Sequence, residues 1–243
     1  MAAAPQIMTL PARSWRINRT KAIAVALVCW AAFAAIVWLV HNGRAGDIDR
    51  IGLLFWRRAP QLTPRGPRWL LEAVRDLTSL GGVLLRNLIA AGAVAALLFL
   101  RLRREAVLLA LTIALGWVVD WAIKVSVGRA RPTIVPHLTE AGGSSFPSGH
   151  SFNSAVVYLA IALAFATLSA RESVRLTVIV SALLLSLVVA WSRVWLGVHF
   201  PTDVAAGWLG GIGWALLAAG ILQRPAAAMA ESDTAKNLDP TVH

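Results

Sequence analysis

The sequence predicts an all-α, polytopic membrane protein with six transmembrane helices. Three observations support this fold class. Of the 243 residues, 58% are hydrophobic and only 14% are charged, which is far more apolar than one soluble core requires. The mean hydropathy of the chain is +0.67. The apolar residues also fall into six segments, each near the length that a helix needs to cross the hydrocarbon core of a bilayer.

We expect the six helices over residues 22–40, 83–100, 106–123, 152–168, 174–190 and 203–222. The first segment follows four basic residues, as in a signal peptide, but its apolar core is too long and no clear small-residue cleavage site follows. We therefore interpret it as an uncleaved first helix. The helical domain would cover residues 22–222, between a basic cytoplasmic tail at 1–21 and a disordered cytoplasmic tail at 223–243.

The charges of the connections set the expected orientation. The short connections 101–105 and 169–173 carry four arginines, which mark the cytoplasmic side together with the N-terminal tail. The longer connection 41–82 is also basic and contradicts this rule, although four acidic residues partly offset its charge. Its stretches around 51–56 and 69–80 are expected to form short helices in the membrane interface.

The formal net charge of +11 raises nucleic acid as a partner. The basic residues lie mostly in the N-terminal tail and between apolar segments, where membrane loops face anionic lipid. We therefore expect membrane lipids as partners and no nucleic acid. The single cysteine, Cys29, lies inside the first apolar segment and is interpreted as a small buried hydrophobic residue. The sequence does not indicate an oligomeric state.

Polar residues concentrate in three short stretches: "KVSVGRARP" (Lys124–Pro132), "PSGH" (Pro147–His150) and "SRVWLGVHFPTD" (Ser192–Asp203). On the expected topology all three open on the outer face. Individually they have simpler interpretations, because basic side chains snorkel to the interface and serine, proline and glycine cap helices. Together they supply three cations, a hydroxyl, two histidines and a carboxylate, which suit a tetrahedral oxyanion bound at helix N-termini.

These stretches resemble the three signature motifs of the type 2 phosphatidic acid phosphatase superfamily, K-x6-RP, PSGH and SR-x5-H-x3-D. That superfamily includes bacterial lipid phosphatases and shares its site with vanadium-dependent haloperoxidases. All eleven specified positions are present in order between Lys124 and Asp203, and the six-helix layout extends the resemblance to residues 22–222. The resemblance implies a membrane phosphatase whose active site is on the outer face.

The resemblance also implies three catalytic residues. His199 would attack phosphorus and form a phosphohistidine. Asp203 would accept a hydrogen bond from the other imidazole N–H and so fix the tautomer, which is feasible if the next helix includes Pro201 in its first turn. His150 would protonate the departing lipid oxygen and then deprotonate the attacking water.

Five further residues would bind the phosphate. The cations of Lys124, Arg131 and Arg193 would neutralise the non-bridging oxygens, where phosphoryl transfer gains most of its stabilisation. The Ser148 hydroxyl and the Gly149 amide would complete the site, because a residue without Cβ lets the backbone approach the phosphate closely.

The acidic residues argue against a metal site. Of 12 acidic residues, only Asp120 and Asp203 lie at the outer ends of the helices, with Glu140 nearby in a loop. A two-metal phosphatase needs a cluster of carboxylates and histidines. We therefore expect a metal-independent reaction that needs no cofactor.

Four polar residues near the motifs have open roles. Asp120 lies four residues before Lys124, so it either orients the lysine or only neutralises it at the membrane boundary. Arg129 either touches a lipid headgroup or snorkels. Arg86 and Asn87, at the start of the second helix, either line the site or lie in the membrane interface, which is the simpler interpretation.

The leading hypothesis is a phosphatase of lipid phosphates or diphosphates in a bacterial cytoplasmic membrane, with its site facing the periplasm or exterior. Undecaprenyl diphosphate is favoured as substrate because an outward site faces the place where carrier lipid is recycled, with phosphatidic acid and phosphatidylglycerol phosphate next. The alternative is a membrane protein that binds or transports lipid phosphates without hydrolysis. That alternative has no need of His150 and His199. A haloperoxidase is disfavoured because known members are soluble.

Overall fold

The computed structural model describes residues 17–222 as eight α-helices and two short strands. The helices are α1 (Arg19–His41), α2 (Gly46–Leu54), α3 (Arg68–Ser79), α4 (Val83–Phe99), α5 (Arg103–Val127), α6 (Gly149–Ala166), α7 (Glu172–Trp195) and α8 (Pro201–Leu222). Strands β1 (Arg57–Arg58) and β2 (Thr63–Pro64) form an antiparallel hairpin between α2 and α3. This hairpin is a small departure from the expected all-α chain.

All six expected long helices are present, as α1 and α4 to α8. Within residues 17–222, five helices are individually long and apolar enough to cross a membrane: α1, α5, α6, α7 and α8. The shorter helix α4 is long and apolar enough to cross a membrane only when α3 is counted with it, and the two helices are bent by 46° where they meet. The structure therefore has five candidate spans, or six if the bent pair counts as one.

The boundary of the N-terminal tail differs from the expected one. The first helix begins at Arg19 because the Asn18 side chain caps it, accepting a hydrogen bond of 3.0 Å from the Lys21 amide. Residues 19–21 thus belong to the helix, and the rest of the expected tails, 1–16 and 223–243, lies outside the described residues. The expected short helices of the 41–82 connection are present as α2 and α3, with α2 earlier in the chain than expected.

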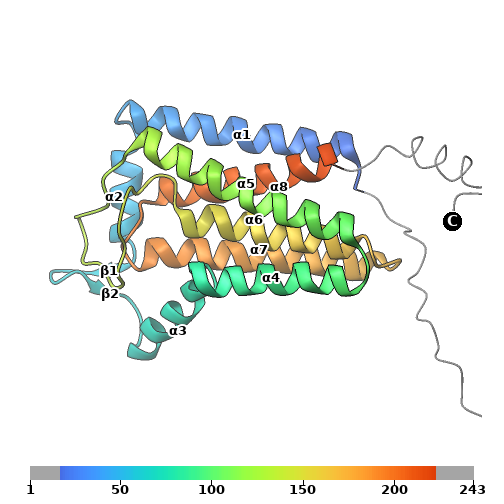
Figure 1. Ribbon diagram of the computed structural model, residues 1–243. Coiled ribbons are helices and arrows are strands. Elements are labelled where there is room, and N and C mark those ends of the chain that lie inside the picture. Colours follow the sequence, from blue (N-terminus) through green and yellow to red (C-terminus); the bar gives the residue numbers. More distant parts are fainter. Residues whose placement is uncertain (1–16, 223–243) are drawn as a thin grey trace, which may run out of the picture.

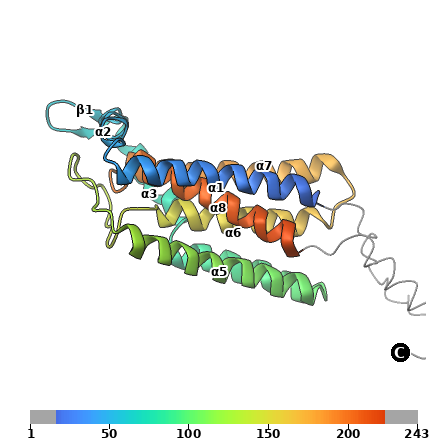
Figure 2. The same ribbon diagram turned by 90° about the horizontal axis from the view of Figure 1, so that it is seen from above.

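Helix α6 lies at the centre of the bundle. Residues 151–160 are all buried, including the polar Ser151, Asn153 and Ser154. It packs against α5, α7 and α8, while α1 packs along the outside of α8 (Figures 1 and 2). The helix that carries the "PSGH" stretch is therefore held by three neighbours.

Glycines bring α8 unusually close to α6. A Cβ atom on Gly207 would lie 2.7 Å from the Ser148 carbonyl oxygen, and one on Gly211 would overlap the Phe152 carbonyl oxygen. Small residues one helical turn apart allow such close backbone approach in membrane helices. The first turns of α6 and α8, which follow two of the three polar stretches, are consequently held side by side.

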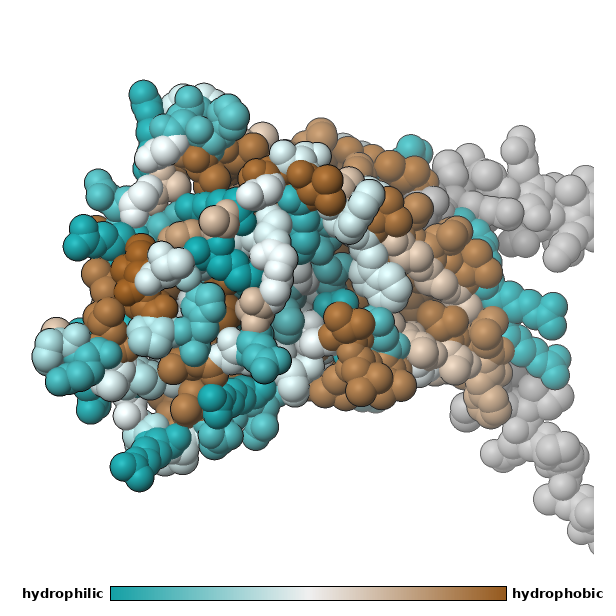
Figure 3. Space-filling view, turned by 60° about the vertical axis from the view of Figure 1, so that its left-hand side comes forward, coloured by the Kyte–Doolittle hydropathy of each residue, from teal (hydrophilic) through white to brown (hydrophobic). Residues whose placement is uncertain are grey.

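The two ends of the bundle differ in character. Residues 17 and 222 and the short connections α4–α5 and α6–α7 lie at one end (Figure 1). The opposite end carries α2, the hairpin, α3 and the long 128–148 loop, and Figure 3 shows hydrophilic surface gathered over it. The three polar stretches all lie at this second end, which confirms that they share one end of the molecule.

The close contact between α6 and α8 leads to a test by Gly211→Ala. The added Cβ must displace one helix, so we expect about 1–3 kcal/mol of destabilisation, measured by thermal unfolding in detergent. Gly92→Ala is the matched control, because a Cβ there meets nothing within 4 Å. The control should be neutral or stabilised by up to about 1 kcal/mol. Equal stabilities of the two variants would contradict this account of the packing.

Candidate active site

A cavity of about 340 Å³ opens at the hydrophilic end of the bundle. Its walls come from α5, α6, α7, the 128–148 loop and the turn before α8. The lining residues are Lys124, Arg131, Glu140, Ala141, Gly142, Gly143, Ser144, Gly149, His150, Arg193 and His199. Six of the eight residues expected in the site therefore line one cavity, although they are far apart in the sequence.

His199 lies in the short turn that joins α7 to α8. The turn is possible because Gly197 adopts a φ of +78°, and a Cβ there would lie 2.7 Å from the Arg57 guanidinium. That buried guanidinium donates a hydrogen bond of 2.8 Å to the carbonyl of Trp195, the last residue of α7. The imidazole itself is only 2% exposed.

Burial keeps the His199 imidazole neutral. Loss of solvation lowers its pKa from the ordinary value of 6.5 to about 4, and the charges of Arg131 and Arg193 act in the same direction. Asp203 opposes this shift only partly. A neutral imidazole at physiological pH has a free lone pair, as a nucleophile requires.

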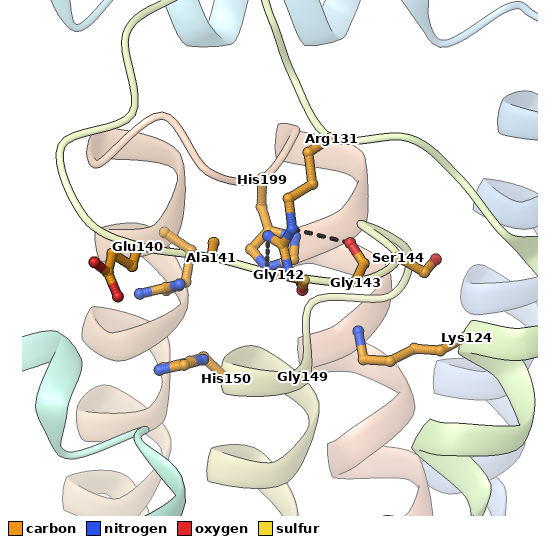
Figure 4. A pocket seen from close by; sticks show the side chains of 11 residues that line it. Lys124, Arg131, Glu140, Ala141, Gly142, Gly143, Ser144, Gly149, His150 and His199 are labelled. Atoms are coloured by element: carbon orange, nitrogen blue, oxygen red, sulfur yellow. Dashed lines mark hydrogen bonds between the residues drawn. The ribbon is translucent and has the colours of Figure 1, made fainter.

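The contacts of the ring also define its tautomer. Arg131 Nη1 lies 3.0 Å from His199 Nε2, and because a guanidinium only donates, Nε2 must be the acceptor. The proton of the neutral ring is therefore on Nδ1. Figure 4 shows Arg131 and His199 side by side, with Lys124 and His150 across the cavity from them. The bare nitrogen thus lies beside a cation at the cavity wall.

Arg131 also holds the loop over the cavity. Its Nη2 and Nε donate to the carbonyls of Gly142 and Gly143 at 2.7 and 3.1 Å. Its Nη1 additionally donates to the Val198 carbonyl at 2.8 Å. One guanidinium therefore links the loop to the turn that carries His199.

Asp203 lies in the first turn of α8, but its contact with His199 is not the direct hydrogen bond expected. The Nδ1 to Oδ2 distance is 3.7 Å, too long for a hydrogen bond. The Ser145 hydroxyl donates to that Oδ2 at 2.5 Å and lies 3.4 Å from Nδ1. The Phe200 amide also donates to Oδ2, at 3.0 Å. Ser145, which the motifs do not include, thus lies beside the two expected partners and contacts both of them.

Arg129 is neither a lipid contact nor a snorkelling residue. It donates to Asp203 Oδ1 at 2.5 Å and to Asp49 Oδ2 at 2.6 Å, and its guanidinium lies over the Phe200 ring. Asp49 on α2 also accepts hydrogen bonds from the amide and hydroxyl of Thr202. This buried carboxylate therefore caps α8 and pairs with Arg129 at the same time.

Lys124 and Gly149 join α5 to the start of α6. The lysine Nζ donates to the Pro147 carbonyl. Asp120 accepts a hydrogen bond of 3.0 Å from Asn153, which also donates to the Gly149 carbonyl. A Cβ on Gly149 would lie 3.2 Å from the Asp120 carboxylate and 3.3 Å from the Lys124 side chain, so both side chains pack closely against this glycine. Asp120 is buried inside the bundle and is hydrogen-bonded to Asn153. It therefore does more than neutralise a lysine at the membrane boundary.

Arg193 and His150 complete the wall near the bend between α3 and α4. Arg193 is buried on α7 and donates to the Thr78 hydroxyl at 3.0 Å. His150 lies in the first turn of α6, where a Cβ on Gly81 would come within 3.0 Å of its ring. Arg86 is buried too and donates to the Gly81 carbonyl at 2.8 Å, so the interfacial position expected for it is wrong.

Ser148 was expected to bind phosphate, but its hydroxyl does not face the cavity. Its side chain is fully buried and its hydroxyl accepts a hydrogen bond of 3.0 Å from Ser151. It is not among the residues that line the cavity. Its backbone N–H instead donates to the Asp203 carbonyl at 3.0 Å, so this residue joins the starts of α6 and α8.

The acidic side chains are arranged as partners of other residues. In the part of the chain that the structure describes, residues 17–222, no three His, Cys, Asp or Glu side chains are grouped so that they could hold a metal ion. Asp49, Asp120 and Asp203 each accept hydrogen bonds from protein groups. The charged groups that face the cavity are mainly cations, as an anionic ligand requires.

The chain is similar to characterised proteins along most of its length. The model of the PAP2 superfamily matches residues 105–226. The chain is 34% identical over 142 residues to phosphatidylglycerophosphatase B of Bacillus subtilis (strain 168), covering 57% of this chain and 68% of that protein. It is 32% identical over 114 residues to YbjG of Escherichia coli (strain K12), a candidate undecaprenyl-diphosphatase, covering 45% of this chain and 53% of that protein.

Two further similarities agree with these. The chain is 32% identical over 111 residues to the lipid A 1-phosphatase of Rhizobium johnstonii, covering 42% of this chain and 41% of that protein. It also superposes on the crystal structure of a transmembrane PAP2-type phosphatidylglycerolphosphate phosphatase from Bacillus subtilis. That match has a TM-score of 0.70 at 25% identity and covers 85% of this chain and 96% of the other. The chain is therefore an integral membrane protein that belongs to the PAP2 superfamily.

Proposed function

We propose that the protein hydrolyses the phosphate or diphosphate headgroup of a membrane lipid through a phosphohistidine on His199, without a metal ion. The observation that carries this proposal is the unprotonated Nε2 of a neutral imidazole at the wall of a cation-lined cavity. Nε2 accepts a hydrogen bond from Arg131, which the arriving phosphorus would replace. A neutral imidazole is a competent nucleophile toward phosphorus, and the three cations suit the charge of the phosphoryl group.

The proposed reaction has two steps. In the first, the Nε2 lone pair forms a bond to phosphorus while the bond between phosphorus and the lipid or leaving-phosphate oxygen breaks. His150 gives its proton to that departing oxygen. In the second step His150 takes a proton from water, whose oxygen displaces His199 from phosphorus and releases inorganic phosphate. Both histidines then return to their starting protonation states.

Electrostatic stabilisation comes from Lys124, Arg131 and Arg193. Arg131 is already in contact with the attacking nitrogen, so its guanidinium would lie beside the non-bridging oxygens when phosphorus arrives. The N-terminal ends of α6 and α8 add partial positive charge on the same side of the cavity. We do not assign the Ser148 hydroxyl a direct contact, because it is bonded to Ser151.

The proposed orientation places the cavity on the outer face of a bacterial cytoplasmic membrane. The arginine-rich connections 101–105 and 169–173 lie at the end opposite to the cavity (Figure 1), as the positive-inside rule expects for the cytoplasmic side. The basic 41–82 connection at the cavity end runs against this rule. Arg57 within it is buried in protein, but the other six arginines are exposed, so the orientation rests on the two short connections.

The substrate class follows from the shared chemistry of the relatives. Their names cover phosphatidylglycerol phosphate, undecaprenyl diphosphate and the 1-phosphate of lipid A, all of which present a terminal phosphoryl group at the membrane surface. We propose that same group as the substrate of this chain. We propose phosphatidylglycerol phosphate and undecaprenyl diphosphate as equally favoured substrates. Phosphatidylglycerol phosphate is included because both the similar structure and one similar protein are named as phosphatases of that lipid.

The proposed function is tested by phosphate release from purified protein in detergent with EDTA present. Phosphatidylglycerol phosphate, undecaprenyl diphosphate and phosphatidic acid are compared side by side. We expect release to survive chelation and to fall by at least about a thousandfold in His199→Ala, as for loss of a nucleophile. His41→Ala, an exposed histidine at the far end of α1 from residue 17, is the matched control. Equal release by His199→Ala, or release from none of these lipids, would instead support lipid-phosphate binding or transport.

The protonation state of His199 gives a second test. Because burial lowers its pKa to about 4, the neutral Nδ1–H tautomer should persist from pH 8 down to roughly pH 5 and titrate only below that. Nitrogen-15 NMR of histidine-labelled protein, with His199→Ala to assign the signal, measures both the pKa and the tautomer. A pKa near 6.5, or a proton on Nε2, would contradict the nucleophile assignment.

A further inference from the structure

The carboxylate of Asp203 is held on both of its oxygens by residues that the three motifs do not specify. Arg129 donates to Oδ1 at 2.5 Å, and the Ser145 hydroxyl donates to Oδ2 at 2.5 Å. The Asp203 side chain is fully buried, so solvent does not compete with these contacts. The direction of this carboxylate is thus set by two side chains from the chain segments on either side of the 130–144 loop.

Ser145 and Arg129 are also joined to each other. The Ser145 amide donates a hydrogen bond of 2.7 Å to the Arg129 carbonyl. Together the contacts close a ring: the Arg129 side chain to Asp203, Asp203 to the Ser145 hydroxyl, and the Ser145 backbone to Arg129. The two side-chain bonds of this ring are charge-assisted and end on the buried Asp203 carboxylate, and a closed ring restricts each member more than a single pair would.

The ring reaches the reacting histidine through one oxygen atom. The Ser145 hydroxyl gives its own proton to Asp203, so its lone pairs remain available to the Nδ1–H of His199, 3.4 Å away. Asp203 itself is further from Nδ1, at 3.7 Å. The hydroxyl is therefore the nearer acceptor for the proton that fixes the tautomer.

We propose that Ser145 and Arg129 are positioning residues of the phosphoryl-transfer reaction, which hold Asp203 and, through the Ser145 hydroxyl, the His199 imidazole in the attacking orientation. The inference rests on the proposed function. It extends the expected histidine–aspartate pair to four residues: His199, Ser145, Asp203 and Arg129. The same loop lines the cavity at residues 140–144, so the ring also couples the wall that meets the substrate to the nucleophile.

Arg129 has a second effect, on charge. Its guanidinium neutralises part of the Asp203 carboxylate, and Asp49 holds it there from the other side. The charged and titratable groups around the imidazole are Arg131, Arg193, His150 and Asp203. If either ring member is removed, Asp203 has more negative charge and more free lone pairs to offer to an imidazolium at His199. The pKa of His199 should then rise, which is a signature that a purely structural role does not produce.

The test compares Ser145→Ala, Ser145→Thr and Arg129→Lys with wild type. We expect kcat to fall by roughly ten- to a hundredfold in Ser145→Ala and Arg129→Lys with KM within about twofold, because the loss is one of orientation rather than of phosphate binding. Ser145→Thr keeps the hydroxyl and should recover most of the rate. Ser126→Ala is the matched control, since that exposed hydroxyl on α5 only contacts the Ala122 carbonyl.

The second readout is the histidine NMR titration, which does not depend on hydrolysis. We expect the His199 pKa to rise by about one unit in Ser145→Ala and to stay unchanged in Ser126→Ala. Arg129→Lys keeps the positive charge beside Asp203, so that variant tests the positioning role through kcat alone. An unmoved titration in Ser145→Ala, together with a kcat within twofold of wild type in both folded ring variants, would overturn the proposed positioning role. Hydrolysis that survives His199→Ala would overturn the proposed function instead, and the two failures are therefore separable.

Discussion

Asp203 accepts hydrogen bonds from all three of the chain segments that carry the motifs. Its carbonyl receives the Ser148 amide, its Oδ1 receives Arg129, and its Oδ2 receives Ser145 and the Phe200 amide. These contacts require the first turns of α6 and α8 to lie side by side, which the glycines of α8 permit. The location of the cavity, the direction of His199 and the approach of the 128–148 loop all depend on this junction.

The junction also explains how a charged site exists at the end of an apolar bundle. Partly buried arginines such as Arg129 and Arg131 are costly unless their donors are satisfied. Arg129 is paired with two carboxylates, and Arg131 has carbonyl acceptors for each of its nitrogens. His199, which Arg131 contacts, is kept neutral by burial. The site is therefore rigid and ready for an anion, with few charges that must reorganise when a phosphate binds.

Hydropathy and motif spacing predicted the helices and the shared end of the bundle, because both depend on local sequence. The contacts made by distant residues were not predictable in this way. Asp49 caps α8 from helix α2, which is about 150 residues away in the sequence. No motif around Asp49 indicates this contact. Arg86 was predicted to be interfacial because it lies at the start of an apolar segment. Its side chain is instead buried and donates to the Gly81 carbonyl at the α3–α4 bend. Ser145 lies two residues before the "PSGH" stretch, and this closeness in sequence was the one indication that it could belong to the site.

The most direct test of the account is to trap the covalent intermediate. Enzyme is mixed with lipid carrying a labelled terminal phosphate, quenched within milliseconds and digested, and the labelled peptide is identified by mass spectrometry. The account predicts an acid-labile, alkali-stable phosphoryl group on His199 that forms at up to one per active enzyme. It also predicts that the group accumulates in His150→Ala once the leaving group is made good enough to depart unprotonated. A labelled group on another residue, or turnover with no covalent phosphate at any time, would contradict it.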